Sequence, residues 1–138
     1  MEHGIKGHVC ASSMASAGGA IAIGEAFRLI KNGHADRVLT GGVDYNVNAN
    51  CIGGMNEFKA LTRSHNETPD KAMRPFDIQR SGTVLSDGGA FLMLESESSA
   101  INRGATQIYG EVAGFNMNCD AYHVLRPTDS GVGLISAI

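Results

Sequence analysis

A helix followed at once by a buried strand constrains the fold more than any other feature of this sequence. Apolar side chains recur at three- and four-residue intervals over residues 20–31, which predicts a helix with one buried face. Asn32 and Gly33 follow and tolerate the positive φ of a helix end. The segment RVLT at residues 37–40 then predicts a short buried strand that enters a glycine-rich turn at Gly41. This order indicates an α/β layered fold with a parallel central sheet.

The rest of the chain continues the alternation of helices and strands, without an internal repeat or a linker. Pro75 fixes its own φ and biases Arg74 away from helical geometry, so we expect a rigid turn there. The other expected elements are a short helix within residues 51–61, a buried strand over 90–95, a helix over 96–103 that ends at Gly104, a strand over 108–114 and a helix over 132–138.

Composition and charge exclude several classes of partner. The chain has 138 residues and a net charge of -3 without a stripe of basic side chains, which excludes nucleic acid as an expected partner. Its apolar runs are shorter than the ~18 residues that cross a bilayer, so no membrane contact is expected. The glycine pairs at Gly41-Gly42 and Gly88-Gly89 lack the spacing of phosphate-binding loops, and close backbone packing is their expected role.

Neither the cysteines nor the histidines predict a metal or another cofactor. Cys10, Cys51 and Cys119 are odd in number and widely spaced, which favours reduced thiols in a reducing compartment. The five histidines share no ligand spacing. The first residues have neither the layout of a secretory signal nor that of a transit peptide. We therefore expect a cytoplasmic protein, or a mitochondrial or plastid one if a targeting segment is missing.

Six short segments carry motifs in a recognisable order. They are IGEAFRLI at residues 23–30, GHADRV at 33–38, GGVD at 41–44, FKALT at 58–62, RPFDIQR at 74–80, and DAYH at 120–123 with Pro127. In this order and spacing they resemble the β-ketoacyl-acyl-carrier-protein synthases, the condensing enzymes of fatty acid and polyketide synthesis. The resemblance runs the length of the chain.

The resemblance implies a fold, an activity and partners. The fold is the α/β, thiolase-like layered fold, of which residues 1–138 would be part of the N-terminal domain. The family transfers acyl groups during fatty acid or polyketide chain elongation, with an acyl carrier protein that delivers acyl and malonyl thioesters. A dimer of the chain with itself or with a synthase homologue is also implied.

The resemblance places the nucleophile position at Ser16. The family's active cysteine lies eight residues before the glycine of an Ile-Gly pair, and counting back from Gly24 gives Ser16. Ser16 then has three interpretations: a residue that caps a helix, a weak acyl acceptor, or a replacement of the family's cysteine. Cys10 lies on the expected strand before this turn and is interpreted as a buried thiol, with a shift of register that makes it the nucleophile as the alternative.

The replacement of cysteine by serine matters chemically. The family's cysteine takes an acyl group from a carrier thioester, and the N-terminus of its helix favours the thiolate. A serine hydroxyl has a far higher intrinsic pKa and needs an adjacent general base. We therefore expect slow acyl transfer at best from Ser16.

The resemblance places some of the family's other site residues after Ile138 and others within this sequence. The two catalytic histidines and a glycine-rich loop would follow Ile138, so we expect no complete site within these residues. His123 matches a family position near the site, where a structural or rim role is expected. Met55 and Phe58 match a segment at the family's dimer interface beside the acyl pocket, and they are candidates for lining that pocket, with core packing as the alternative.

The segment after Arg80 departs from the family pattern. Ser81, Thr83 and Ser86 replace a charge, an aromatic side chain and a glycine. Thr83 in place of phenylalanine would leave space in a packed segment, a change that commonly costs about 3–5 kcal/mol when uncompensated. We interpret this as a retained local structure under relaxed selection for catalysis.

Three functions therefore compete. The chain is part of a condensing acyltransferase with Ser16 at the nucleophile position, or a non-catalytic partner subunit that resembles a chain-length factor, or an incomplete product without a function of its own. The third case predicts poor solubility, because a sheet edge and apolar faces would be exposed.

Overall fold

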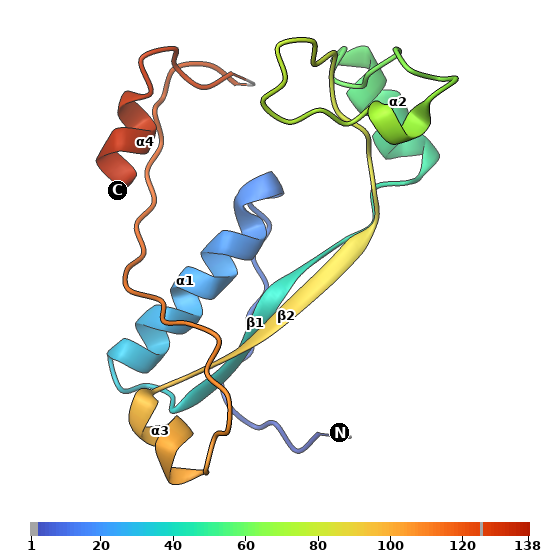
Figure 1. Cartoon of the computed structure of the whole chain (residues 1–138). Coiled ribbons are helices and arrows are strands. Elements are labelled where there is room, and N and C mark those ends of the chain that lie inside the picture. Colours follow the sequence, from blue (N-terminus) through green and yellow to red (C-terminus); the bar gives the residue numbers. More distant parts are fainter. Residues whose placement is uncertain (1–2, 125) are drawn as a thin grey trace. The chain divides into compact units, whose positions relative to one another are not determined.

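The computed structural model describes residues 3–124 and 126–138 (Figure 1). The chain divides into two compact units, which are described separately: unit 1 (Met1–Gly42 and Phe91–Ile138) and unit 2 (Val43–Ala90). The elements in chain order are η1 (Ala15–Ala17), α1 (Gly18–Lys31), β1 (Arg37–Asp44), α2 (Ala49–Glu57), η2 (Pro69–Lys71), β2 (Gly88–Glu95), α3 (Glu97–Asn102) and α4 (Val132–Ala137).

Helix α1 confirms the helix predicted over residues 20–31 and begins two residues earlier, because the turn η1 leads directly into it. Its C-terminus is closed as the sequence indicates. Gly33 has a φ of 72°, and the amide of His34 donates to the carbonyl oxygen of Leu29 over 2.8 Å. A glycine at this position satisfies the last carbonyls of the helix without the steric cost of a side chain.

The sheet differs from the predicted one. Only β1 and β2 form it within the described residues, and Figure 1 shows the two strands running in opposite directions. The amide of Ser96, just after β2, donates to the carbonyl oxygen of Asp36, just before β1, over 3.2 Å. The expected parallel sheet is therefore wrong for this pair. A parallel pair needs a crossover that brings the chain back to the end of the sheet where the first strand began. Here β2 begins beside the end of β1 and runs back along it.

Strand β1 continues through Gly41 and Gly42 to Asp44 instead of turning at the glycines. A Cβ atom on Gly42 would lie 3.3 Å from the Cα atom of Gly19 at the start of α1. The predicted role in close backbone packing is thus confirmed for Gly42. A Cβ atom on Gly88 would meet nothing within 4 Å, so close packing does not explain the glycine at that position.

Two further predictions about strands are wrong. Residues 108–114 form no strand, and neither do the residues around Cys10, whose side chain is exposed instead of buried. Strands exist through hydrogen bonds with a neighbouring strand, and the described residues supply no partner for either segment. Apolar runs of this length carry no information about whether such a partner is present.

Helices α2, α3 and α4 confirm the other predicted helices with shifted ends. Ser96 caps α3 by accepting the amide hydrogen of Ser99 over 3.2 Å, and Gly104 follows the helix with a φ of 72°. Across α3, Nε of Arg103 donates to Oε1 of Glu95 over 2.9 Å. That hydrogen bond is the largest cause of a lowered pKa of Glu95, and it raises the pKa of Arg103 in turn.

The buried apolar positions of the described residues are all small. Ala26 and Ala100 are buried in unit 1, and Ala72 is buried in unit 2. Large apolar side chains are widely exposed, with Phe76 at 101% and Ile78 at 93% as the extreme cases in unit 2. Since apolar burial scales with area, each unit holds together with little hydrophobic stabilisation of its own.

Candidate functional site

Ser16 lies in a strained turn at the start of α1. Its side chain is exposed within η1, and the preceding Ala15 has a φ of 47°, a conformation that a residue with a side chain adopts only at a cost of about 1–3 kcal/mol. The residue that caps α1 is Ala17, which makes no side-chain hydrogen bond. Ser16 therefore caps neither η1 nor α1, and the helix-capping interpretation is wrong.

The N-terminus of α1 has no side-chain cap beside this turn, although the amides of Ala17 and Gly18 donate to the carbonyl oxygens of Met14 and Ala15. Its first turn contains no acidic residue, and no side chain caps it. The first amide hydrogens of a helix have no partner within the helix, and the aligned peptide dipoles add a partial positive charge there. This environment stabilises a thiolate or an oxyanion at position 16. It would assist a cysteine strongly and a neutral hydroxyl weakly.

An apolar cavity of about 570 Å³ adjoins the same turn. Its lining includes Met14, the residue before η1, Ala17 of η1, Ala20 and Ile21 of α1, and residues 115–118. All of these belong to unit 1. Sequence reasoning missed this cavity. The small residues Ala17 and Ala20, three positions apart at the start of the helix, were the available signal, and the opposing segment could not be known from spacing.

Phe115 packs closely against α1 because Gly24 has no side chain. A Cβ atom on Gly24 would lie 2.2 Å from the ring of Phe115, and the Arg28 guanidinium lies 5.1 Å from the centre of the same ring. Ring and guanidinium at this distance attract through a cation–π interaction. Gly24, which the count to Ser16 used, thus has a packing role of its own.

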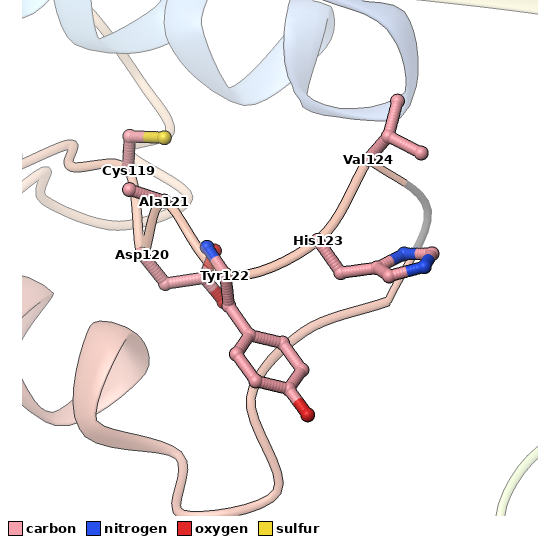
Figure 2. A pocket seen from close by; sticks show the side chains of 6 residues that line it. All are labelled: Cys119, Asp120, Ala121, Tyr122, His123 and Val124. Carbon is pink, nitrogen blue, oxygen red and sulfur yellow. The ribbon is translucent and has the colours of Figure 1, made fainter.

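His123 lies in an open loop of unit 1 (Figure 2). Residues 119–124 line a hollow of about 320 Å³, in which the side chains of Tyr122 and His123 point in different directions. Asp120 shapes the loop, because its Oδ2 accepts the amide hydrogen of Thr128 over 3.0 Å, and Nδ1 of His123 accepts that of Arg126 over 3.3 Å. These contacts are those of a structural loop, and the predicted rim role of His123 stays a prediction.

Met55 and Phe58 both lie in unit 2, whereas Ser16 lies in unit 1. Met55 is half-buried on α2, and Phe58 follows the helix with 62% of its surface exposed. The structure brings these two candidates together at one end of α2. Their role in an acyl pocket stays a prediction.

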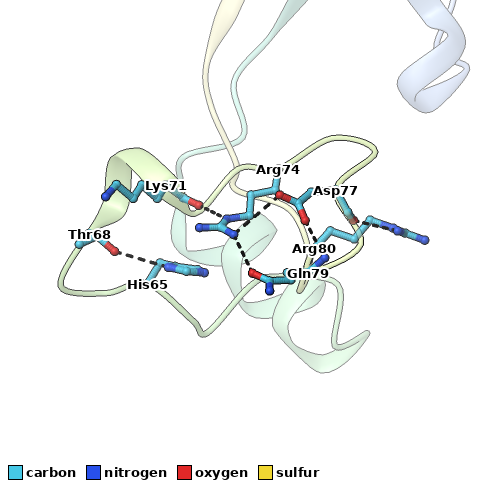
Figure 3. A network of polar contacts seen from close by, with 7 residues as sticks. All are labelled: His65, Thr68, Lys71, Arg74, Asp77, Gln79 and Arg80. Carbon is cyan, nitrogen blue, oxygen red and sulfur yellow. Dashed lines mark hydrogen bonds and ion pairs between the residues drawn. The ribbon is translucent and has the colours of Figure 1, made fainter.

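The turn predicted at Pro75 is confirmed and is held by polar contacts (Figure 3). The amide of Asp77 donates to the carbonyl oxygen of Arg74 over 3.3 Å. Nε of Arg74 donates to the carbonyl oxygen of Lys71 over 2.7 Å, and the amide of Gln79 donates to Oδ1 of Asp77 over 2.7 Å. The motif's arginine and aspartate therefore act within the segment itself, as a local scaffold.

The described residues contain no group of three or more His, Cys, Asp or Glu side chains that could hold a metal ion. Cys10 and Cys119 are exposed, Cys51 is half-buried, and all three thiols are free. None of the helices in the described part of the chain has the length and apolar character needed to span a bilayer.

Comparison with known sequences agrees with the motifs. Residues 1–100 match the model of the β-ketoacyl synthase N-terminal domain. A mitochondrial 3-oxoacyl-[acyl-carrier-protein] synthase of Arabidopsis thaliana is 37% identical over 138 residues, which are 100% of this chain and 30% of that protein. The 3-oxoacyl-[acyl-carrier-protein] synthase 2 of Synechocystis is 42% identical over 135 residues, or 98% of this chain and 32% of that protein. The chain thus spans about a third of these curated relatives.

Solved structures share the fold. A chain from a complex between a type II polyketide ketosynthase, bound to a hexaketide, and its acyl-carrier protein superposes with a TM-score of 0.84 at 34% identity, covering 88% of this chain and 30% of that chain. The ishigamide ketosynthase/chain length factor superposes with a TM-score of 0.72 at 35% identity, covering 86% and 28%. The chain belongs to the β-ketoacyl synthase family and has the corresponding part of its thiolase-like fold.

Proposed function

We propose that the chain is part of a condensing acyltransferase of fatty acid or polyketide elongation, with position 16 as its acyl-acceptor position. The observation that carries the proposal is the strained turn Ala15-Ser16 in front of the uncapped N-terminus of α1. In the proposed step, the nucleophile at position 16 attacks the thioester carbonyl, and the carrier's thiol leaves with the proton that the nucleophile gives up. The acyl group is then held on the chain.

The other members of the proposed site are Met55, Phe58 and His123. Met55 and Phe58 would line the acyl pocket from α2, and His123 would lie at the rim. Met55 is suited to such a wall because it is half-buried and unbranched. The proposed domain is the whole of residues 1–138 and extends past the matched residues 1–100, in keeping with the relatives that align with almost all of the chain.

The proposed partner is an acyl carrier protein. The chain is also proposed to form a dimer, either with itself or with a synthase homologue. A related ketosynthase has been solved in complex with its acyl-carrier protein, which supports the first of these. The proposed location is the cytoplasm. A relative is mitochondrial, which keeps the mitochondrion or a plastid as the alternative.

A second candidate function is that of a non-catalytic partner subunit. The observation that favours it is Ser16 itself, since the family's cysteine is absent and the uncapped helix N-terminus offers little activation to a hydroxyl. One of the similar solved structures contains a chain length factor. A subunit of this kind would act through dimer contacts and the shape of an acyl tunnel.

The intact mass of the protein after incubation with an acyl-carrier thioester distinguishes the two functions. The unmodified chain is compared with Ser16→Cys and with Ser16→Ala as the control. We expect Ser16→Cys to gain the mass of the acyl group rapidly, the unmodified chain to gain it slowly, and Ser16→Ala to gain none.

Each of the remaining results has a defined meaning. Labelling of Ser16→Cys alone would favour the partner subunit, because the pocket forms and lacks its nucleophile. The same mass gain in Ser16→Ala as in the unmodified chain would remove Ser16 from the reaction. If none of the three proteins gains the mass of the acyl group, both functions are contradicted, because no acyl pocket forms.

A further inference from the structure

The segment just before β2 binds the chain on both sides of α2, at residues that precede and follow the helix. At the C-terminal end, the amide of Thr83 donates to the carbonyl oxygen of Ala60 over 2.9 Å, and the amide of Thr62 donates to the carbonyl oxygen of Thr83 over 3.0 Å. These bonds form a parallel bridge between Leu61 and Thr83. They involve backbone atoms alone, so they do not depend on the side chain at position 83.

At the N-terminal end the contact is made by a side chain. Oδ1 of Asp87 accepts the amide hydrogen of Asn46 over 2.7 Å and that of Val47 over 2.8 Å. The acceptor and its donors are 41 and 40 positions apart in the sequence. Hydrogen bonds to a carboxylate are shorter and stronger than those to neutral acceptors. Asp87 therefore holds the two residues that lead directly to the cap of α2.

The cap passes this constraint to the helix. Oδ1 of Asn48 accepts the amide hydrogen of Cys51 over 3.0 Å, while its Nδ2 donates to the carbonyl oxygen of Tyr45 over 3.0 Å and to Sγ of Cys51 over 3.3 Å. The turn before the helix and its first turn are thus joined through one side chain. A displacement of Val47 would be carried into α2 and so to Met55, one turn further along.

We propose that Asp87 is a positioning residue, which sets the place of α2 and thereby the length of acyl chain that the protein accepts. The inference rests on the proposed function, because it takes Met55 on α2 as a wall of the acyl pocket. Thr83 anchors the far end of the helix through its backbone, so Asp87 is the anchor that substitution can remove.

The test compares three substitutions in the full chain. Asp87→Asn keeps an oxygen acceptor of the same reach, Asp87→Glu keeps the charge but is longer by one methylene, and Asp87→Ala removes the acceptor. The first readout is hydrogen exchange of the Asn46 and Val47 amides. The second is the rate at which iodoacetamide alkylates Cys51, with the exposed thiols of Cys10 and Cys119 as internal controls.

A third readout reports on the pocket itself. In the Ser16→Cys background, the ratio of adduct formed from hexanoyl- and tetradecanoyl-carrier thioesters gives the preference for chain length. We expect Asp87→Ala and Asp87→Glu to raise the alkylation rate of Cys51 about tenfold without changing Cys10 or Cys119, and to flatten the preference for chain length. Asp87→Asn, which keeps the acceptor without the charge, should stay closer to the parent than either of them in all three readouts.

Several results would overturn the inference. An Asp87→Ala chain with unchanged exchange at Asn46 and Val47 would show that the carboxylate holds nothing. Altered exchange with an unchanged preference for chain length would show that the anchor does not shape the pocket. If Asp87→Ala does not fold, the comparison of Asn with Glu decides, and an Asp87→Glu chain closer to the parent than Asp87→Asn contradicts positioning by geometry.

The proposed function can fail separately. If Ser16→Cys forms no adduct at any chain length, the pocket role of Asp87 falls with the proposed function. The exchange and alkylation measurements do not use an acyl group, and they still decide whether Asp87 holds α2.

Discussion

Each of the two units of this chain is stabilised internally by a different kind of contact. In unit 1, α1 packs through close approaches of small residues, such as Gly42 on Gly19 and Phe115 on Gly24, and its N-terminus has no side-chain cap. In unit 2, α2 is capped by Asn48 and anchored by Asp87. The helix start without a side-chain cap is the one beside Ser16, the proposed nucleophile position. A helix start without a side-chain cap leaves its dipole open to an anion, at the expense of helix stability.

The largest expected effect is in unit 2, at Gly82. This residue has a φ of 132°, and a Cβ atom there would lie 2.6 Å from the amide nitrogen of Thr62 and 2.8 Å from the carbonyl oxygen of Ala60. Both contacts are with backbone atoms, which cannot rotate away. We expect Gly82→Ala to cost about 2–4 kcal/mol of stability, measured by urea denaturation and by loss of exchange protection at Thr83.

Gly53 provides the matched control in the same unit. It lies inside α2, and its Cβ position meets nothing within 4 Å. Gly53→Ala should stabilise the chain by about 0.5–1 kcal/mol, because alanine favours the helix. Equal effects at Gly82 and Gly53 would contradict the assignment of Gly82 as the residue that permits the bridge.

The second effect tests the apolar packing of unit 1. Gly24→Ala should cost about 1–3 kcal/mol, because the new methyl group displaces the ring of Phe115. The Phe115→Ala substitution leaves room for that methyl group, so the two changes should be far from additive in a double-mutant cycle of thermal unfolding. Additive losses would show that Gly24 is required for another reason.

The third effect concerns the cap that α1 lacks and α2 has. Asn48→Ala should destabilise unit 2 by about 1 kcal/mol, since the amide of Cys51 loses its acceptor. Asn50→Ala, on the same helix, is the control and should change stability by less than ~0.5 kcal/mol. If hydrogen exchange at the first turn of α2 is unaffected by Asn48→Ala, the Asn48 side chain does not stabilise the start of α2, and the contrast with α1 is wrong.

The smallest expected effect is ionic and lies in unit 1. The hydrogen bond from Arg103 lowers the pKa of Glu95 below its usual 4.5, so the folded chain binds this proton less tightly than the unfolded chain. The resulting stabilisation is present above pH 4.5 and is lost as the pH falls through the lowered value. Thermal unfolding between pH 7 and pH 3 measures it.

Glu95→Gln should flatten this dependence on pH, and the loss should be smaller at high salt because Arg103 is partly exposed. Glu97→Gln, on the neighbouring turn of α3, is the control. An unchanged profile in Glu95→Gln would assign the acid sensitivity of unit 1 to other groups.

Local elements were predictable from local patterns. The start and end of α1 follow from apolar periodicity and from Gly33, and the turn at Pro75 follows from the fixed φ of proline. The strand predicted over residues 108–114 is absent, and the sequence could not show this, because an apolar run indicates burial without identifying the partner strand that must accept its hydrogen bonds. The same limit explains the wrong prediction for Cys10.

The candidate site was predictable in part. Spacing within one helix and its preceding turn predicts the turn that holds Ser16, because both lie on a continuous stretch of chain, while the nucleophile role of Ser16 stays a prediction. The cavity beside η1 required residues 115–118, about a hundred positions away, and the anchor of α2 required Asp87. Contacts across such separations depend on how the chain returns.

The sequence by itself determined the family and most of the helices, because these depend on motif order and on periodicity over a few turns. The tertiary structure alone decided the antiparallel pairing of β1 and β2, the strain at Ala15, the uncapped start of α1 and the two-ended anchoring of α2. Each of these depends on which distant backbone groups meet, and hydrogen bonds between distant groups leave no periodic trace in a sequence.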